Sequence, residues 1–206
     1  MNVDKIIIKS ILTTLTSILL LFVFMVTTLV FVFPQTMMTL SYDLGMERAS
    51  IHFARVAYER RDSVYYIAYA TDVAIESEDD EKIVACGEEL IADEDFASYC
   101  ETRNEAKEET TETPYEQYVY GQVCVSTYKS GDKTKAVNRA FELVQGGFCK
   151  NNAVVAIIMT AFSAKDTATL QDVKGKMEQM RKDGFSSEDD DYFGLILAAL
   201  EGQTNG

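Results

Sequence analysis

Apolar and charged positions divide the chain sharply at residue 33. Residues 11–33 read ILTTLTSILLLFVFMVTTLVFVF, a run of 23 residues without a charged side chain. At about 1.5 Å per residue, a helix of this length covers roughly 34 Å, enough for a hydrocarbon core of about 30 Å. Its Thr and Ser hydroxyls can bond back to helix carbonyls, and Pro34 follows at once as a natural stop. The segment therefore predicts a transmembrane helix that contacts the lipid bilayer through residues 11–33.

A cleaved signal peptide is the alternative interpretation of this segment. Signal peptides have an apolar region of about 7–15 residues, followed by small residues at the cleavage site. Here the apolar run is longer, and residues 33–38 (FPQTMM) offer no small-residue site. The sequence therefore favours an uncleaved signal anchor, preceded by a short tail at residues 1–10.

The charges that flank the anchor predict its orientation. Lys5 and Lys9 precede the apolar run against the single acid Asp4, whereas Asp43 and Glu47 are the first charges beyond it. Cytoplasmic flanks carry the excess of Lys and Arg. We therefore expect a single-pass membrane protein with a cytoplasmic N-terminus and an extracytoplasmic C-terminal domain.

Beyond the anchor, the spacing of apolar residues predicts helices and no strands. Start signals support several of them, namely Thr113 with Pro114, then Asp132, then Asp166. A polar stretch at 101–113 holds no large apolar residue and is expected to be a linker. The expected helices cover 38–60, 63–75, 79–91, 114–129, 133–144, 152–164, 167–184 and 186–200. Residues 38–206 are thus expected to form one acidic all-α domain.

Self-similarity indicates that these helices come in repeated pairs. Residues 65–91 align with 118–144 at an offset of 53, with seven identities in 27 positions. The identical pairs are Tyr65/Tyr118, Ser77/Ser130, Asp79/Asp132, Lys82/Lys135, Val84/Val137, Glu89/Glu142 and Leu90/Leu143. A shift of 34 residues then places 128–143 on 162–177, with Asp132 over Asp166. The larger offset exceeds 34 by about the length of the polar stretch.

A helix-turn-helix period of 34 residues is that of tetratricopeptide repeats. The run YKSGDKTKA at 128–136 resembles the inter-helix turn of that family, as does the small Gly121 that faces it. Residues 177–202 resemble the related pentatricopeptide type. The resemblance covers 63–202, although the chain has no Trp and most units lack the closing proline. It implies an α-α superhelical array of hairpins, in which stacked units bury the apolar face that one hairpin cannot.

The resemblance also implies a binding role, because such arrays present a concave groove to a peptide or a partner helix. Aromatic residues on the expected helices are the candidates for lining it, with core packing between helices as the alternative. The candidate partner-binding residues are Tyr65, Tyr69, Tyr118, Tyr120 and Tyr128.

Net charge narrows the choice of partner. The chain carries −14 at pH 7, whereas a nucleic-acid binder needs positive charge to neutralise phosphates. An acidic surface can attract a basic protein or peptide, or it can simply keep the domain soluble. We therefore expect a protein or peptide partner, with a basic one as a candidate, and no nucleic acid.

Residues suited to catalysis or metal binding are few. His52 is the only histidine, and the acidic runs at 76–81, 93–95 and 188–191 lie at expected helix starts, where negative charge is favoured anyway. No nucleotide-binding, hydrolase or zinc motif occurs, so no cofactor, metal or small-molecule substrate is predicted. Four cysteines, at 86, 100, 124 and 149, leave both free thiols and disulfides open.

The favoured interpretation is a membrane-anchored helical-repeat scaffold that mediates protein–protein interaction at the cell envelope, and not an enzyme. Two alternatives stay open. An envelope hydrolase could use acidic residues, since any two carboxylates can converge in a fold. The anchor could instead drive oligomerisation in the membrane through its hydroxyls at positions 13, 14, 17, 27 and 28.

Overall fold

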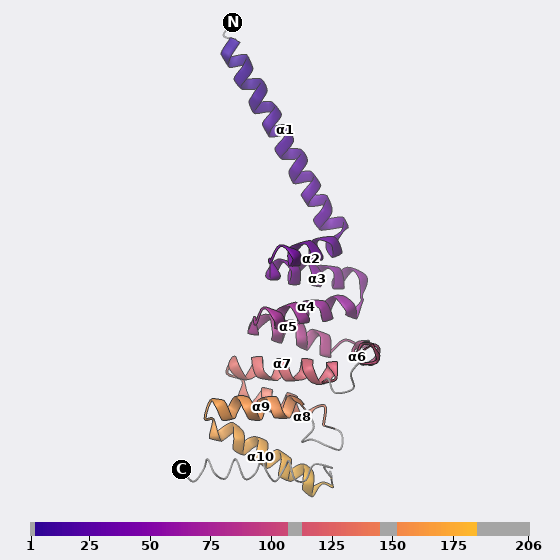
Figure 1. Ribbon diagram of the computed structural model, residues 1–206, viewed down its shortest axis with the longest axis vertical. Coiled ribbons are helices and arrows are strands. Elements are labelled where there is room, and N and C mark those ends of the chain that lie inside the picture. The colour runs from indigo at the N-terminus through magenta and orange to yellow at the C-terminus, as the bar shows by residue number, and fades with distance from the viewer. Residues whose placement is uncertain (1–2, 107–112, 145–151, 185–206) are drawn as a thin grey trace. The chain divides into compact units, whose positions relative to one another are not determined.

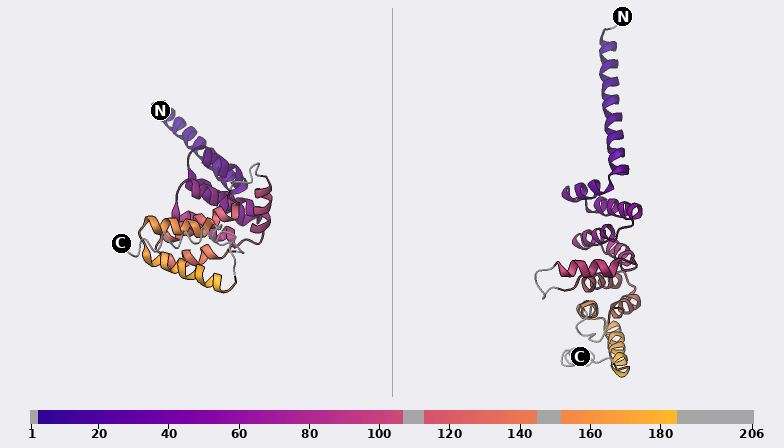
Figure 2. Two further views of the ribbon diagram at one scale, coloured as in Figure 1. Left: turned by 60° about the horizontal axis from the view of Figure 1, so that its bottom comes forward. Right: turned by 90° about the vertical axis from the view of Figure 1, so that its right-hand side faces the viewer.

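The computed structural model describes residues 3–106, 113–144 and 152–184. Within these ranges the chain forms ten helices and no strand, so the prediction of an all-helical protein is confirmed for them (Figures 1 and 2). The chain divides into two compact units, residues 1–62 and residues 63–206, which are described separately below.

The first unit begins with α1 (Val3–Val32), an apolar helix. Its segment Ile7–Val32 is long and apolar enough to cross a membrane. The back-bonding expected of its hydroxyls is confirmed: Thr13, Thr16 and Ser17 donate to carbonyls four residues earlier at 2.8–2.9 Å. Thr27 and Thr28 do the same at 2.7 and 2.8 Å. These hydroxyl protons are therefore used within the helix.

The single helix expected at 38–60 is wrong, because the structure forms a hairpin there. Helix α2 (Pro34–Asp43) ends before Gly45, and α3 (Glu47–Arg61) runs back along it. Gly45 has a φ of 67°, and the N–H of Met46 donates to the carbonyl of Ser41 at 2.8 Å. A glycine in the left-handed region that closes such a bond is a common helix C-terminus. The hairpin is held by buried Met38 and Ile51, and by the Ser50 hydroxyl, which donates to the Met38 carbonyl at 2.9 Å.

The described part of the second unit contains three more hairpins and one additional helix. The hairpins are α4 (Val64–Glu76) with α5 (Asp80–Ile91), α7 (Tyr115–Lys129) with α8 (Lys133–Phe141), and α9 (Asn152–Ser163) with α10 (Thr167–Lys182) (Figure 1). Helix α6 (Phe96–Glu105) lies between the first and the second. Part of the expected linker is thus helical, since α6 includes residues 101–105. The helix expected at 186–200 lies outside the described residues.

The same type of turn joins the two helices in each hairpin of this unit. It has a left-handed residue followed by an Asp whose side chain accepts the N–H three residues later. The left-handed residues are Glu78 (φ 53°), Gly131 (φ 98°) and Lys165 (φ 53°). The accepting residues are Asp79, Asp132 and Asp166, which bind the N–H groups of Lys82, Lys135 and Thr169. The expected caps at Asp132 and Asp166 are confirmed, and the turns recur at the sequence offsets of 53 and 34.

The cap expected from Thr113 is wrong. Pro114 occupies the N-cap position of α7 and makes no side-chain cap bond. Asn104 of α6 supplies the cap instead: its Oδ1 accepts the N–H of Tyr115 at 2.8 Å, and its Nδ2 donates to Glu116 at 2.8 Å. A side chain distant in sequence therefore satisfies the first turn of α7.

Candidate interaction surface

Two helices of the second unit contact solvent along a single narrow line of side chains. In α4, from residue 65 to residue 76, only positions 65, 69, 72 and 76 escape full burial. In α7, from 118 to 129, only positions 118, 122, 125 and 129 do. The spacing i, i+4, i+7, i+11 follows one side of an α-helix. These two sets are equivalent at the offset of 53, so the same side of the first helix is open in both hairpins.

The third hairpin keeps this side open as well. At the offset of 34, the equivalent described positions in α9 are 156, 159 and 163, and all three are partly or fully exposed. Met159 is 60% exposed. The exposed band of α9 is wider, because Phe162 is also exposed at 39%. We call these positions on α4, α7 and α9 the first-helix face. Its members are Tyr65, Tyr69, Asp72, Glu76, Tyr118, Gln122, Val125, Lys129, Ala156, Met159 and Ser163.

The α4 and α7 parts of this face meet around Asp72. The Tyr115 hydroxyl at the start of α7 donates to Asp72 Oδ1 at 2.9 Å. Burial, and then the charges of Asp72 and Glu76, raise the pKa of Tyr118, one turn further along α7. Two exposed aromatic rings, Tyr65 and Tyr118, and the carboxylates of Asp72 and Glu76 therefore belong to one surface.

Helix α6 connects α4 and α7 in this region through the side chain of Arg103. Arg103 donates to Asp72 Oδ2 at 2.7 Å and to the Tyr99 hydroxyl at 3.3 Å, while its guanidinium lies 3.8 Å from the ring centre of Tyr115. Burial lowers the pKa of Arg103, but the hydrogen bond with Asp72, the charge of Asp72 and the contacts with Tyr115 and Tyr99 together outweigh it, so the net direction is upward. Burial and the Asp72 charge raise the pKa of Tyr115, which keeps its hydroxyl protonated as a donor. Asp72 therefore links three helices.

The five tyrosines predicted from the sequence fall into two groups. Tyr65 and Tyr118 are 50% and 39% exposed, and Tyr69 is partly exposed, so these three lie on the first-helix face. Tyr120 and Tyr128 are 8% and 7% exposed. The ring of Tyr120 packs 6.4 Å from that of Phe96 and lies under Arg139, and the Tyr128 hydroxyl donates to Asp166 at 2.8 Å. These two tyrosines hold neighbouring helices together.

Sequence reasoning missed the polar members of the face. Glu76, Gln122 and Lys129 are not aromatic, so a search for tyrosines passes over them. The repeat alignment could have revealed these residues, since Glu76 and Lys129 are equivalent at the offset of 53. The helical spacing i, i+4, i+7, i+11, counted from Tyr65 and from Tyr118, leads to all three residues.

Groups suited to metal binding or nucleophilic chemistry do not gather in the described parts of the chain. Residues 3–106, 113–144 and 152–184 contain no group of three or more His, Cys, Asp or Glu placed to hold a metal ion. Cys100 and Cys124 are buried free thiols, Cys86 is buried, and Cys149 lies outside the described residues. Burial raises the pKa of Cys100 and of Cys124 to about 12, so both stay protonated and unreactive at neutral pH. His52 lies exposed on α3 beside Phe53.

No family model, curated protein or solved structure matches the chain. Function is therefore argued below from the chain's own residues.

Proposed function

We propose that this protein is a membrane-anchored helical-repeat scaffold whose first-helix face binds a segment of another protein. The observation that carries the proposal is the narrow exposed line on α4 and α7: over residues 65–76 and 118–129, each helix escapes burial at only four positions, all on one side. A helix that serves only as core has no reason to expose an aromatic ring at the same position in two units. Tyrosine is also enriched among the residues that dominate binding energy at protein interfaces.

The recurrence of one turn supports a tetratricopeptide-like arrangement of the hairpins. The left-handed residue and the capping Asp recur at offsets of 53 and 34, which are the offsets of the sequence repeat. In such an array the first helices line the inner surface, where a peptide or a partner helix lies across several units. An extended or helical segment that contacts Tyr65, Tyr118 and Gln122 in succession fits this geometry.

Charge suggests the composition of the partner. Residues 63–206 hold 28 acids and 13 bases, a net charge of −15. Glu76 adds negative charge to the face beside the two exposed tyrosines, whereas the charge of Asp72 is paired with Arg103. A basic partner segment with a few apolar side chains is therefore the best match, with electrostatic attraction chiefly accelerating its association.

The proposal places this surface across the membrane from the N-terminus. Helix α1 acts as an uncleaved anchor, and the excess of lysines before it keeps the N-terminal tail in the cytoplasm. The first-helix face then meets partners outside the cytoplasm. The buried thiols of Cys100 and Cys124 are compatible with that location, because buried protonated thiols react poorly with oxidants.

Site-specific photo-crosslinking in cells tests the proposed surface. A photoreactive residue is placed at Tyr65, Tyr118 or Gln122, and at three exposed control positions on second helices, Glu81, Gln171 and Asp172. We expect the three face positions to give one shared crosslinked product that the control positions do not give. Equal products from both sets, or products from the control set alone, would refute the first-helix face as the binding surface.

A further inference from the structure

Helix α2 exposes a line of apolar side chains that its own hairpin does not cover. Phe33, Met37, Leu40 and Leu44 have the spacing i, i+4, i+7, i+11; Met37 and Leu40 lie on one side of the helix, and Phe33 and Leu44 are its N-cap and C-cap residues. Phe33, Leu40 and Leu44 are 50%, 44% and 65% exposed, and Met37 is partly exposed. The residues of α2 that pack inward are Pro34, Met38 and Ser41. We call the four exposed residues the α2 apolar line.

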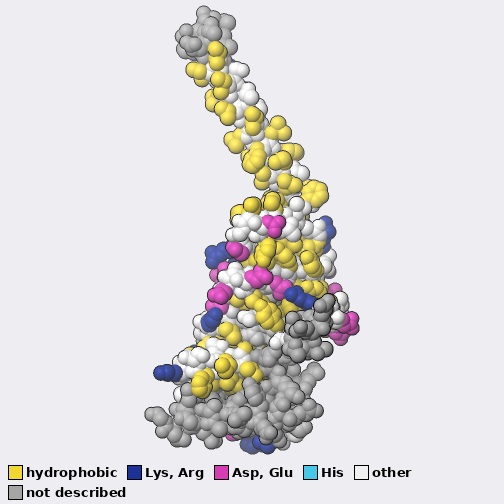
Figure 3. Space-filling model, in the orientation of Figure 1, with side chains coloured by type: hydrophobic (Ala, Val, Ile, Leu, Met, Phe, Trp, Pro, Cys, Tyr) yellow, Lys and Arg dark blue, Asp and Glu magenta, His cyan; other side chains and the backbone are white. Residues whose placement is uncertain are grey.

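This line continues the apolar surface of α1. Phe33 is both the last residue of the apolar run and the first member of the line, and Pro34 starts α2 directly after it. Within the first unit, α2 lies across the end of α1 rather than extending it (Figures 1 and 2). Yellow apolar side chains pass from α1 onto the start of the hairpin without a break in Figure 3. If α1 spans a bilayer, α2 therefore begins at its surface.

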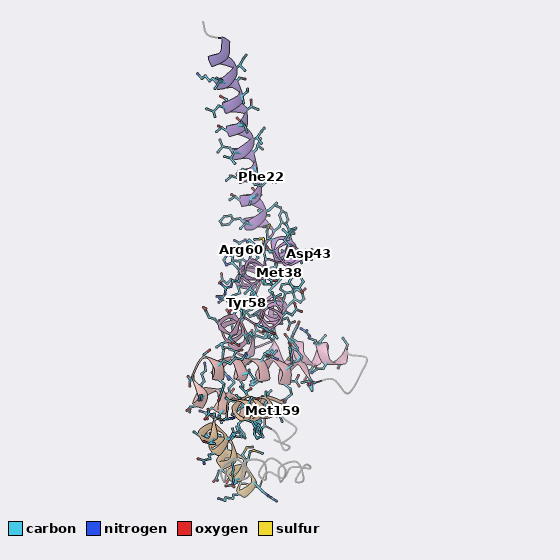
Figure 4. The ribbon with its side chains drawn as sticks, turned by 60° about the vertical axis from the view of Figure 1, so that its left-hand side comes forward. Phe22, Met38, Asp43, Tyr58, Arg60 and Met159 are labelled. Atoms are coloured by element: carbon cyan, nitrogen blue, oxygen red, sulfur yellow. The ribbon has the colours of Figure 1, made fainter. Side chains whose placement is uncertain are left out.

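Helix α3 ties the hairpin to this position. The Arg60 guanidinium donates to the carbonyl of Phe31, and it lies 5.8 Å from the centre of the Phe31 ring. The Phe31 carbonyl belongs to the last turn of α1, where carbonyls lack partners within the helix and the helix dipole favours a cation. Figure 4 shows Arg60 beside the end of α1 and Met38 between α2 and α3. The hairpin is thus fastened at the end of the apolar helix.

The charge of the hairpin differs from that of the rest of the chain. Residues 34–62 hold four acids and four bases, so their net charge is zero, against −15 for residues 63–206. A neutral segment meets no repulsion from anionic headgroups, whereas the acidic second unit does. Amphipathic helices with apolar residues on one side and polar residues on the other lie in such interfaces.

We propose that the α2–α3 hairpin lies in the membrane–water interface, with the α2 apolar line at the boundary between headgroups and acyl chains. The occupant of this apolar surface is the lipid bilayer. The hairpin then holds the chain at the membrane surface, at the point where α1 leaves the bilayer. This inference rests on the proposed role of α1 as an anchor.

Single tryptophans test the inference cleanly, because the chain contains no Trp. The full-length chain is reconstituted in phosphatidylcholine vesicles with one Trp in place of Phe22, Leu44 or His52. Phe22 is in the middle of α1, Leu44 belongs to the α2 apolar line, and His52 is exposed on α3 of the same hairpin. Quenching by lipids brominated near the headgroup or deep in the acyl chain then reports the depth of each Trp. Circular dichroism verifies that each variant keeps its helices.

We expect Phe22→Trp to be quenched most by deep bromines and Leu44→Trp by shallow ones, with at least twofold more shallow quenching for Leu44→Trp than for His52→Trp. Deep quenching of Phe22→Trp, with Leu44→Trp no more quenched than His52→Trp, would overturn the interfacial hairpin and leave the anchor standing. Absence of quenching at Phe22 would overturn the anchor, and the hairpin inference with it.

Discussion

Replacing Asp166 with alanine is expected to lower the free energy of unfolding by about 2.5–4 kcal/mol. Asp166 caps α10 by accepting the N–H of Thr169, and a lost Asp cap costs about 1 kcal/mol. Its Oδ2 also accepts the hydroxyl of Tyr128 on α7 at 2.8 Å and pairs with Lys133 on α8 at 2.7 Å. Alanine leaves the buried Tyr128 hydroxyl without this acceptor, which adds about 1.5–3 kcal/mol for a bond to a charged group. Urea unfolding of the full-length chain in detergent measures the change.

Asp132 provides the matched control for this prediction. It caps α8 from the equivalent position of the preceding hairpin, where its side chain accepts the N–H of Lys135. Asp132→Ala is therefore expected to cost only the cap, about 1 kcal/mol. Equal costs for the two variants would show that the contacts of Asp166 with α7 and α8 contribute nothing to stability.

The effect of Asp166 is also expected to depend on pH. Its hydrogen bond with Lys133, with help from Thr169 and Tyr128, holds the pKa of Asp166 well below its ordinary value of 3.8. A depressed pKa in the folded state means that the carboxylate stabilises the fold above about pH 4, and that this contribution is lost as the pH falls further. The stability difference between the wild-type chain and Asp166→Asn should therefore be constant from pH 8 to pH 5 and shrink below pH 4. A difference that grows on acidification would contradict this assignment.

Gly87→Ala is expected to destabilise the second unit by about 1–2 kcal/mol, although alanine favours helices over glycine by about 1 kcal/mol. A Cβ at position 87 of α5 would clash with Cγ2 of Val123 on α7. Val123 is fully buried, and its branched side chain has little rotamer freedom to yield. Helix α5 or α7 must therefore shift to admit one methyl group. The same unfolding measurement checks this prediction.

Gly175 in the middle of α10 is the control for Gly87. A Cβ there meets no atom within 4 Å. Gly175→Ala should thus raise stability by up to about 1 kcal/mol through helix propensity alone. If both alanines stabilise the chain, α5 and α7 are not in the close contact that the structure gives them.

The sequence predicted helix starts well where the capping residue directly precedes the helix that it caps. Asp132 and Asp166 precede their helices and bind their own N–H groups, so both positions can be read from the sequence. The start of α7 could not be read in this way. Asn104, which caps it, precedes Tyr115 by 11 positions and belongs to a stretch that looks like a polar linker. Contacts made by Arg103 and Asn104 stabilise the end of α6, and composition alone does not reveal such contacts.

The break at Gly45 shows a different limit. Apolar residues continue on both sides of it, so periodicity favoured one long helix over 38–60. A single glycine inside a helical pattern costs only about 1 kcal/mol and does not by itself end a helix. What ends α2 is the left-handed conformation of Gly45 together with the packing of α3 onto Met38, and that packing is a tertiary effect.

The candidate surface could be predicted in part. The aligned pair Tyr65 and Tyr118 is exposed at equivalent positions of the two hairpins, although the sequence left core packing of these rings open. Tyr120 and Tyr128 have the same chemistry but face the neighbouring helices, two and ten positions after Tyr118. Residue type cannot separate these groups, because buried and exposed tyrosines alternate along one helix. The register of the helix against its neighbours decides which ring meets solvent.

The proposed location of the first-helix face and the interfacial hairpin both depend on α1 remaining in the bilayer as an anchor, so protease digestion of intact cells is the most direct test. Cells produce the full-length chain with a C-terminal tag, and a lysed sample serves as the control. We expect protease added outside to remove the tag while a membrane-embedded fragment that contains α1 survives. A tag protected until lysis would contradict the proposed orientation, and a soluble product that has lost α1 before protease is added would contradict the anchor itself.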